Sequence, residues 1–187
     1  LDQDARVWLT SRVRGPNNSP VCLEGSDHPS ARAFPNARAG RHLAVYDPST
    51  DEMTLIGTCY STHHLIFAED DDNTLWTSGG GQVIGWLNTK LFLETGDEEL
   101  AQGWSALVLD TNGNGKRDEG YVGPKDKVDP TRDKRVNAGF YAVMPNPVDG
   151  SIWGTAGVFG GKGKVVRIDP GRNPPATMRT EVYNVPL

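Results

Sequence analysis

The sequence predicts an all-β fold, a β-propeller of about three four-stranded antiparallel blades. Three observations predict it: a recurring strand that contains tryptophan, a recurring strand that ends in an aspartate turn, and abundant glycine and proline. The 187 residues include 22 glycines and 13 prolines, which favours short strands and turns over long helices. The hydrophobic fraction of 36% permits a packed core.

The first recurring pattern is a short apolar strand that follows an acidic or glycine turn. It occurs three times, around Trp8, Trp76 and Trp153. These tryptophans are 68 and 77 residues apart, more than the roughly 40–50 residues of an ordinary blade, so insertions are expected. Because the tryptophans recur in register, we expect them to pack in the core between blades.

The second recurring pattern is a β-rich run that ends in a turn begun by aspartate. It occurs at 43–48, 106–111 and 165–170. An aspartate begins such a turn because its side chain hydrogen-bonds the backbone that follows. Further strands are predicted beside these two patterns, at 53–58, 64–68, 119–122, 140–144 and 178–185. The repeating unit is therefore four antiparallel strands joined by hairpins, which is a propeller blade.

The second blade leaves one ambiguity. Residues 83–88 could form its third strand. We place that strand at 104–110 instead. Asp110 then aligns with Asp47 and Asp169, the turn residues of the other two blades.

A single partial propeller domain is expected over 1–187. Its predicted blades span 1–62, 63–138 and 139–187, with long insertions after the second strand at 12–40 and 79–103. The first blade lacks its first strand. A ring needs about four blades or more, and three would leave open edges. We therefore expect a fragment of a longer chain, or a chain that closes its ring with another copy or chain.

The run from His63 to Asn88 carries His-His-Leu-Ile-Phe-Ala, then Asn-Thr-Leu-Trp-Thr-Ser-Gly-Gly-Gly, then Val-Ile-Gly-Trp-Leu-Asn. It resembles the repeat of the streptogramin B lyase-like (virginiamycin B lyase-like) propellers, and residues 141–169 are similar to a looser copy. NHL-type and lactonase-like propellers share much of this pattern. The resemblance implies a propeller. It also implies elimination across an ester by a histidine base with a bound divalent cation, or lactonase-like hydrolysis.

Loops on one face of a propeller meet at the channel mouth, and all four histidines of the chain fall in such loops. His63 and His64 are expected there as a base or as metal ligands, because histidine titrates near neutral pH. Asp27 and His28 could reach them from the adjacent blade. Gly79-Gly80-Gly81 would let the backbone approach closely. The alternative is that His64 packs at a strand entry and His28 caps a loop.

The same face is expected to bind ligand through Arg12, Arg38, His42 and Trp86. Arginine would orient a carboxylate or stabilise an enolate-like oxygen. The ring of Trp86 would stack on a ring or a sugar. These residue types indicate a small anionic or ester ligand.

Residues 110–118 follow the first nine positions of a calcium loop. Oxygen donors stand at positions 1, 3, 5, 7 and 9, which are Asp110, Asn112, Asn114, the carbonyl of Lys116 and Asp118. Position 12 should be glutamate but is Tyr121, and no helices flank the loop. The candidates are a structural calcium site without an EF-hand, and a plain Asn/Gly hairpin turn.

Cys22 and Cys59 are expected to form one disulfide, and two buried thiols are the alternative. A disulfide would favour a periplasmic or extracellular location. The net charge of −5 argues against nucleic acid as a partner. No run approaches the ~18 apolar residues that span a bilayer.

Two functions remain open. One is a secreted propeller that binds a small anionic or ester ligand at the channel mouth, with lyase-type or hydrolase-type activity. The other is a non-catalytic propeller that serves as a binding or assembly module of a larger protein. The sequence has no GxSxG, Walker or strand-borne GxGxxG motif, so it leaves enzyme status undecided.

Overall fold

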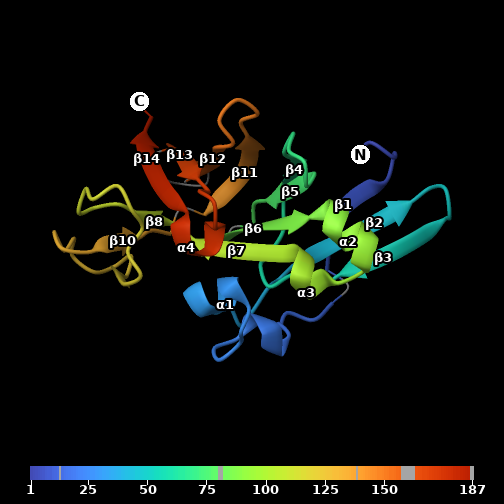
Figure 1. The fold of residues 1–187 in the computed structure, drawn as a ribbon, viewed down its shortest axis with the longest axis horizontal. Helices are drawn as coiled ribbons and strands as arrows, with labels where there is room; N and C mark the ends of the chain where they lie inside the picture. Colours follow the sequence, from blue (N-terminus) through green and yellow to red (C-terminus); the bar gives the residue numbers. More distant parts are fainter. Residues whose placement is uncertain (13, 80–81, 138, 157–162, 186–187) are drawn as a thin grey trace.

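The computed structural model describes residues 1–12, 14–79, 82–137, 139–156 and 163–185. The protein is mostly β, with four small sheets of three or four strands and only short helices (Figure 1). The sheets lie side by side along the long axis of the molecule, and the described residues form no closed ring of blades. The all-β prediction is confirmed at this level.

The first sheet has the strand order β1-β2-β3. Its strands are β1 (Val7–Ser11), β2 (His42–Asp47) and β3 (Glu52–Ile56). The predicted insertion at 12–40 joins β1 to β2 and contains the 3-10 helix η1 (Pro20–Cys22) and helix α1 (Pro29–Ala33). Trp8 is buried and meets Phe67 and Phe92 of the second sheet edge-on, with ring centroids 6.1 and 6.4 Å away.

The second sheet has four strands in chain order, with two short helices between its last two strands. These elements are β4 (Leu65–Phe67), β5 (Thr74–Thr77), β6 (Val83–Asn88), α2 (Thr89–Thr95), α3 (Glu98–Ala101) and β7 (Gln102–Ala106). The prediction of a third strand at 104–110 is wrong, because β6 is the third strand. The predicted insertion at 79–103 is therefore not a single loop.

Asn88 explains that error. In the first sheet the tryptophan strand pairs with Val45, two residues before the turn at Asp47. In the second sheet it pairs with Trp86, two residues before Asn88. Asn88 thus occupies the place of the aspartate, and its Oδ1 accepts a hydrogen bond from the Leu91 amide at 2.8 Å. Asn88 caps the start of helix α2 through its side-chain oxygen, where Asp47 and Asp169 begin tight turns through theirs.

The third sheet is small and has the strand order β8-β10-β9, with β9 and β10 parallel. Its strands are β8 (Val108–Leu109), β9 (Tyr121–Val122) and β10 (Asp133–Arg135). The run at 106–110 therefore leaves the second sheet after Ala106 and begins this one. Asp110 does not align with Asp47 and Asp169.

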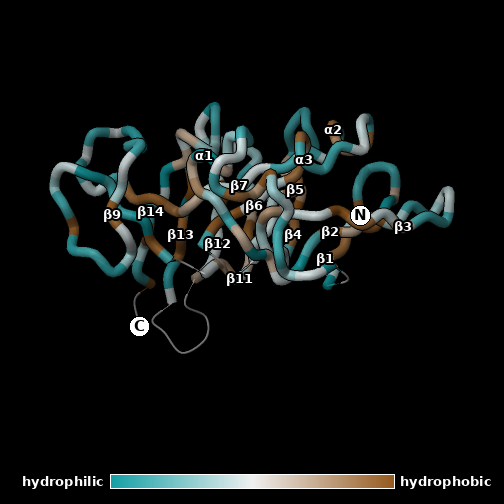
Figure 2. Tube along the Cα trace, turned by 90° about the horizontal axis from the view of Figure 1, so that it is seen from below, coloured by the Kyte–Doolittle hydropathy of each residue, from teal (hydrophilic) through white to brown (hydrophobic). Residues whose placement is uncertain are grey.

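The fourth sheet again has four strands in chain order. Its elements are β11 (Phe140–Pro145), β12 (Ile152–Ala156), β13 (Lys164–Asp169), helix α4 (Pro174–Thr177) and β14 (Arg179–Asn184). Trp76 and Ile84 of the second sheet share one core with Phe140 and Ile152 of the fourth. Figure 2 shows hydrophobic residues along these strands and hydrophilic residues in the outer loops.

The structure confirms two of the three expected core tryptophans. Trp8 and Trp76 are buried between neighbouring sheets. Trp153 is only partly buried and stacks on Tyr183 of its own sheet, with centroids 6.2 Å apart. Its placement in a core between sheets is therefore a wrong prediction.

The predicted disulfide is confirmed. Cys22 and Cys59 are bonded, their Cα atoms are 5.4 Å apart, and both residues are buried. The bond fastens the 12–40 insertion to the segment that follows β3. Within the described ranges, no helix is long and apolar enough to cross a membrane.

Candidate ligand-binding site

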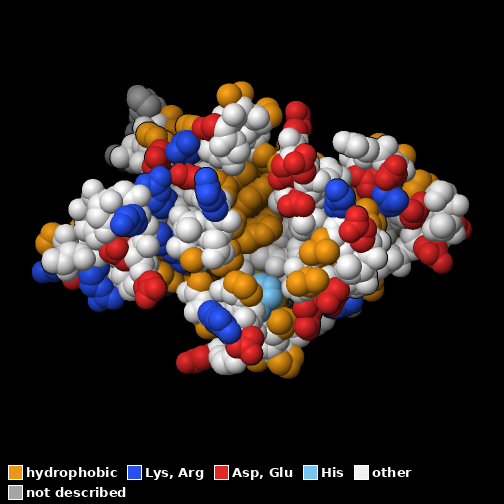
Figure 3. Space-filling model, viewed as in Figure 1, with side chains coloured by type: hydrophobic (Ala, Val, Ile, Leu, Met, Phe, Trp, Pro, Cys, Tyr) orange, Lys and Arg blue, Asp and Glu red, His pale blue; other side chains and the backbone are white. Residues whose placement is uncertain are grey.

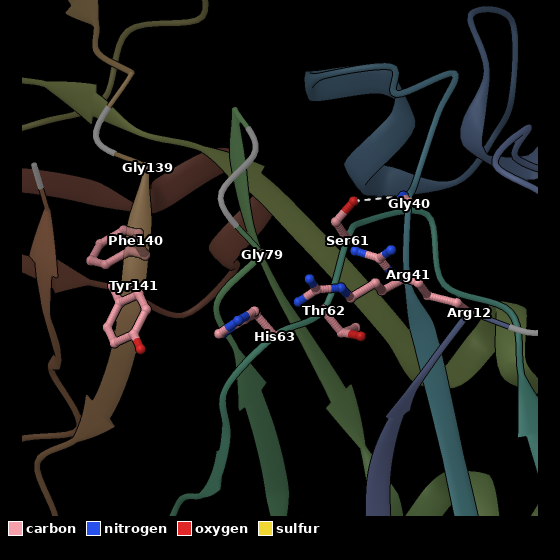
Figure 4. Close-up of a pocket in the computed structure, with 10 residues that line it drawn as sticks. All are labelled: Arg12, Gly40, Arg41, Ser61, Thr62, His63, Gly79, Gly139, Phe140 and Tyr141. Carbon is pink, nitrogen blue, oxygen red and sulfur yellow. Dashed lines mark hydrogen bonds between the residues drawn. The ribbon is translucent and has the colours of Figure 1, made fainter. Parts of the chain in front are cut away.

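A pocket of about 550 Å³ opens where loops of the first, second and fourth sheets meet (Figure 4). These are the loops that the sequence predicted to share one face. Residues that line the pocket include Arg12, Arg41, Ser61, His63, Gly79 and Tyr141. Its described lining contains two arginines and no aspartate or glutamate.

The two arginines of the pocket flank the paired strands β1 and β2. Arg12 directly follows the end of β1, and Arg41 directly precedes the start of β2. Ser11 at the end of β1 pairs with His42 at the start of β2, and one more step of this register sets Arg12 opposite Arg41. Neither guanidinium has an ion pair with a carboxylate of the described residues. Like charges directly opposite each other destabilise a strand pair. The sheet edge therefore presents two positive charges that the protein leaves uncompensated.

The two adjacent histidines contact each other at the entry to β4. The Nδ1 atoms of His63 and His64 are 2.7 Å apart, and His64 Nδ1 is also 2.6 Å from the carbonyl oxygen of Tyr141. Because a carbonyl oxygen only accepts, the hydrogen must lie on His64 Nδ1. That one hydrogen is shared between the Tyr141 carbonyl oxygen and His63 Nδ1, and a neutral His63 carries its own hydrogen on Nε2.

The surroundings of His63 favour its neutral form. Its pKa is lowered below the ordinary value by partial desolvation and by the electrostatic effect of His64 and Arg41. A neutral His63 with hydrogen on Nε2 offers the pocket a hydrogen-bond donor. The pocket therefore combines two guanidinium groups with one imidazole N–H.

Gly79 lets two chain segments approach closely at the floor of the pocket. A Cβ at this position would overlap the carbonyl oxygen of Ser61, so the position requires glycine. The Ser61 hydroxyl in turn accepts a hydrogen bond from the Gly40 amide at 2.8 Å, drawn in Figure 4. The expectation of close backbone approach is met at Gly79, while Gly80 and Gly81 lie outside the described residues.

Asp27 and His28 do not reach this pocket. His28 stacks on Trp104 with ring centroids 4.7 Å apart, and its Nδ1 accepts from the Ser30 amide as the N-cap of α1. Its Nε2 lies 3.2 Å from the carbonyl oxygen of Gln102. The side chain of Asp27 is fully exposed and pairs with Arg32 at 2.6 Å. The prediction that these two residues join the other histidines is wrong, because local contacts already use their polar atoms.

Three predicted ligand-binding residues also lie elsewhere. His42 is buried, accepts from the Thr58 amide at 3.1 Å, and places Nε2 3.3 Å from the Gly15 carbonyl oxygen. Arg38 is exposed next to the isolated bridge that it forms with Asn17. Of the predicted ligand-binding residues Arg12, Arg38 and His42, only Arg12 lines the pocket, where His63 of the predicted histidine pair also lies.

Trp86 lies in a second hollow, of about 750 Å³, between the second and fourth sheets. Figure 3 shows this hollow as an apolar cleft at the centre of the molecule. Trp86 contacts Trp76 there, with ring centroids 5.2 Å apart. The turns around it carry acidic residues, among them Asp70, Asp149 and Asp169. The prediction that Trp86 shares a face with the histidines is therefore wrong.

The loop at 110–118 has internal hydrogen bonds along its length. Asp110 accepts from the amides of Gly113, Asn114 and Gly115 at 2.7–3.1 Å. Asp118 accepts from the side-chain amides of Asn112 and Asn114 at 2.6 and 3.0 Å. Gly113 and Gly115 both have a φ of 74°, a left-handed conformation that favours glycine.

No group of three or more histidine, cysteine, aspartate or glutamate side chains in the described part of the chain could hold a metal ion. At the histidine face only His63 and His64 come together. The expected divalent metal there would need ligands beyond this pair.

Sequence reasoning missed Tyr141 and Ser61 as pocket residues. The only signal for Tyr141 is its place in the predicted strand at 140–144, next to Phe140, which also lines the pocket. Phe140 is buried and Tyr141 is exposed. Comparison with models of known families, with curated proteins and with solved structures finds no match to this chain.

Proposed function

We propose that this protein binds a small organic anion, a carboxylate or an ester of one, in the pocket at Arg12 and Arg41. The observation that carries the proposal is the pair of arginines without a carboxylate partner in a pocket whose described lining is free of acidic residues. A chain of net charge −5 has many carboxylates to place beside two arginines, and places none there. A guanidinium pair recognises a carboxylate through charge-assisted hydrogen bonds.

His63 supports the same function. With hydrogen on Nε2 it donates to an anion and does not compete for a proton. Phe140 and Tyr141 on the opposite wall supply apolar surface for the uncharged part of the ligand. The volume of about 550 Å³ suits a small molecule, since ligand pockets usually enclose about 300–1,000 Å³.

We also propose that the first, second and fourth sheets are blades of an incomplete β-propeller. In each, the tryptophan strand pairs with the next strand two residues before a turn residue. The tryptophans are Trp8, Trp76 and Trp153, and the turn residues are Asp47, Asn88 and Asp169. The third sheet is then an insertion between two blades. The disulfide supports an oxidising compartment, periplasmic or extracellular.

A second candidate function is elimination or hydrolysis of a bound ester, and one observation favours it. His64 carries its hydrogen on Nδ1, so its Nε2 keeps a lone pair. The hydrogen bonds of His64 to described side chains and carbonyl groups use its Nδ1, not its Nε2. His64 is exposed beside His63, which lines the pocket, and could accept a proton there. Without this step the protein is a binding module.

Calorimetric titration with malonate tests the binding proposal. We expect wild-type protein to bind malonate, and Arg12→Gln or Arg41→Gln to weaken binding at least about tenfold, because a hydrogen bond to a charged group contributes roughly 1.5–3 kcal/mol. Arg38→Gln is the matched control and should bind as wild type does. Equal weakening in all three variants, or no binding by wild type, would reject the pocket.

The catalytic candidate is tested with a chromogenic monoester of malonate. If His64 is a base, His64→Gln should abolish release of the chromophore while malonate affinity stays the same. If wild-type protein releases the chromophore no faster than buffer alone does, the protein is a binding module and the catalytic candidate is rejected.

A further inference from the structure

Asp133 is a buried carboxylate in the interior of the third sheet. Its relative exposure is 0%, and its Oδ1 is buried without a hydrogen-bond partner among the described residues. Its Oδ2 accepts from the amide of Asp118 at 2.8 Å. A buried carboxylate oxygen without a partner has lost its hydration without compensation, which is strongly unfavourable.

The strand register places Asp133 against the loop at 110–118. Lys134 pairs with Leu109 across β10 and β8, so one further step sets Asp133 opposite Asp110. On its other side Asp133 pairs directly with Tyr121 of β9. Tyr121 is position 12 counted from Asp110, the position at which a calcium loop requires a bidentate glutamate.

The loop presents oxygen donors from the other positions. Gly115 at position 6 is left-handed, as the sharp turn of a calcium loop requires. Asn112 Oδ1 accepts from the Asn114 amide at 3.1 Å, and Asn114 Oδ1 accepts from the Lys116 amide at 2.8 Å. These bonds turn both amide oxygens toward the loop backbone and both side-chain NH2 groups toward Asp118, so the two amides must rotate for their oxygens to bind an ion.

We infer that the third sheet holds a calcium ion, with Asp133 of β10 as the ligand that replaces the missing glutamate at position 12. The other ligands are Asp110, Asn112, Asn114, the carbonyl oxygen of Lys116 and Asp118. Acidic side chains alone do not form a metal-binding group in the described structure, so amide and carbonyl oxygens must complete the set. Calcium accepts such mixed sets of six to eight oxygens in flexible geometry, whereas Mg²⁺ demands a near-ideal octahedron.

Neighbouring arginine and lysine side chains do not neutralise the buried carboxylate of Asp133. Arg117 donates to the Ser105 hydroxyl at 2.6 Å and lies over the ring of Tyr121, 5.7 Å from its centroid. No lysine or arginine of the described residues forms an ion pair with Asp133. The buried carboxylate of Asp133 therefore has no paired cation among the described residues, although Asp118 and Asp110 lie close enough to repel it.

A calcium ion at this place would stabilise the contact between the third and fourth sheets. Arg179 at the start of β14 donates to the carbonyl oxygen of Gly115 at 2.7 Å and also pairs with Asp169 at 2.9 Å. Because Gly115 lies within the proposed site, an ordered loop fixes this carbonyl for Arg179. The ion would have a structural role and would lie apart from the anion pocket.

The test compares thermal unfolding of wild-type protein and Asp133→Asn in EDTA and in calcium chloride. We expect calcium at about 100 times its Kd to raise the wild-type Tm by roughly 5–10 °C. Asp133→Asn keeps the acceptor for the Asp118 amide and removes the buried negative charge. We therefore expect its Tm in EDTA to be no lower than that of wild type, and its calcium affinity by calorimetry to be at least tenfold weaker.

Asp126→Asn is the control, because Asp126 is exposed in the same segment and its carboxylate accepts only from the Gly123 amide among the hydrogen bonds of the described residues. It should bind calcium as wild type does. Three results would overturn the inference: no calcium binding by wild type, unchanged affinity in Asp133→Asn, or an unfolded or markedly less stable Asp133→Asn in EDTA. An equal response to magnesium chloride at the same concentration would overturn the assignment to calcium.

Discussion

Arg12 and Arg41 stand opposite each other where strands β1 and β2 open, and neither is paired with a carboxylate of the described residues. Like charges across a strand pair oppose folding by roughly 0.2–1 kcal/mol. Removing one charge should therefore stabilise the free protein while it weakens anion binding. Such opposite effects indicate a functional site rather than a structural one.

Arg41→Gln tests this opposition. We expect its free energy of unfolding without ligand to rise by a few tenths of a kcal/mol, up to about 1 kcal/mol, because the cross-strand repulsion is relieved. Urea denaturation in the absence of multivalent anions measures it. A loss of more than about 1 kcal/mol would show that Arg41 has a structural partner, and Arg38→Gln controls for the loss of an exposed arginine.

The lowered pKa of His63 predicts a specific pH dependence. The unfolded chain protonates this histidine near pH 6.5, and the folded protein does so only at lower pH. The contribution of His63 to stability is therefore complete above pH 6.5, falls as the pH drops through this window, and levels off below the folded pKa.

An NMR titration of the histidine ring protons measures that pKa directly. We expect His63 to titrate below 6.5, and saturating sulfate to raise its pKa, because a bound anion favours the imidazolium. His63→Gln identifies the signal. A His63 pKa above 6.5 without ligand would contradict the tautomer and the charge environment inferred for the pocket.

The disulfide should contribute a large part of the stability. Cys22 and Cys59 are separated by 37 residues, and closing a loop of that length stabilises the folded state by about 3–4 kcal/mol. We expect the double variant Cys22→Ser/Cys59→Ser to lose roughly this amount in urea denaturation. Reduced wild-type protein should match the variant. A loss below about 1 kcal/mol would mean that other contacts already hold the 12–40 insertion in place.

Gly85 lies directly beneath the ring of Tyr60. A Cβ at 85 would overlap that ring, and Tyr60 is fully buried with its hydroxyl donating to the Trp86 carbonyl oxygen at 2.8 Å. We expect Gly85→Ala to destabilise the protein by about 1–3 kcal/mol, because the ring cannot move away without losing its packing. Gly163→Ala, which meets no neighbouring atom within 4 Å, should change stability by less than about 0.5 kcal/mol.

Short strands and turns were predictable from sequence because both depend on neighbouring residues. A recurring apolar run with tryptophan, preceded by an acidic or glycine turn, located the strands around Trp8, Trp76 and Trp153. The third strand of the second sheet was missed because Asn88 replaces aspartate with a chemically equivalent acceptor. Because the blades were aligned on their aspartate turns alone, the third strand was predicted at 104–110. Residues of the third sheet were thereby assigned to the second sheet.

The candidate site was only partly predictable. The loop positions of Arg12 and His63 placed both residues at one face, and the structure brings them into one pocket. His28 and His42 have the same residue type and a similar loop position, but hydrogen bonds to distant backbone groups use their ring nitrogens. Asp133 also escaped the local calcium pattern, because only the pairing of β10 with β8 brings it to Asp110.

The most direct test of the account follows the arginine side-chain Nε–H signals by NMR while malonate is added to the folded protein. Arg12 and Arg41 should shift together and saturate at one concentration, with Arg38 unchanged as an internal reference. Saturation without movement of the Arg12 and Arg41 signals, or equal movement of Arg38, would contradict an anion site between these two residues.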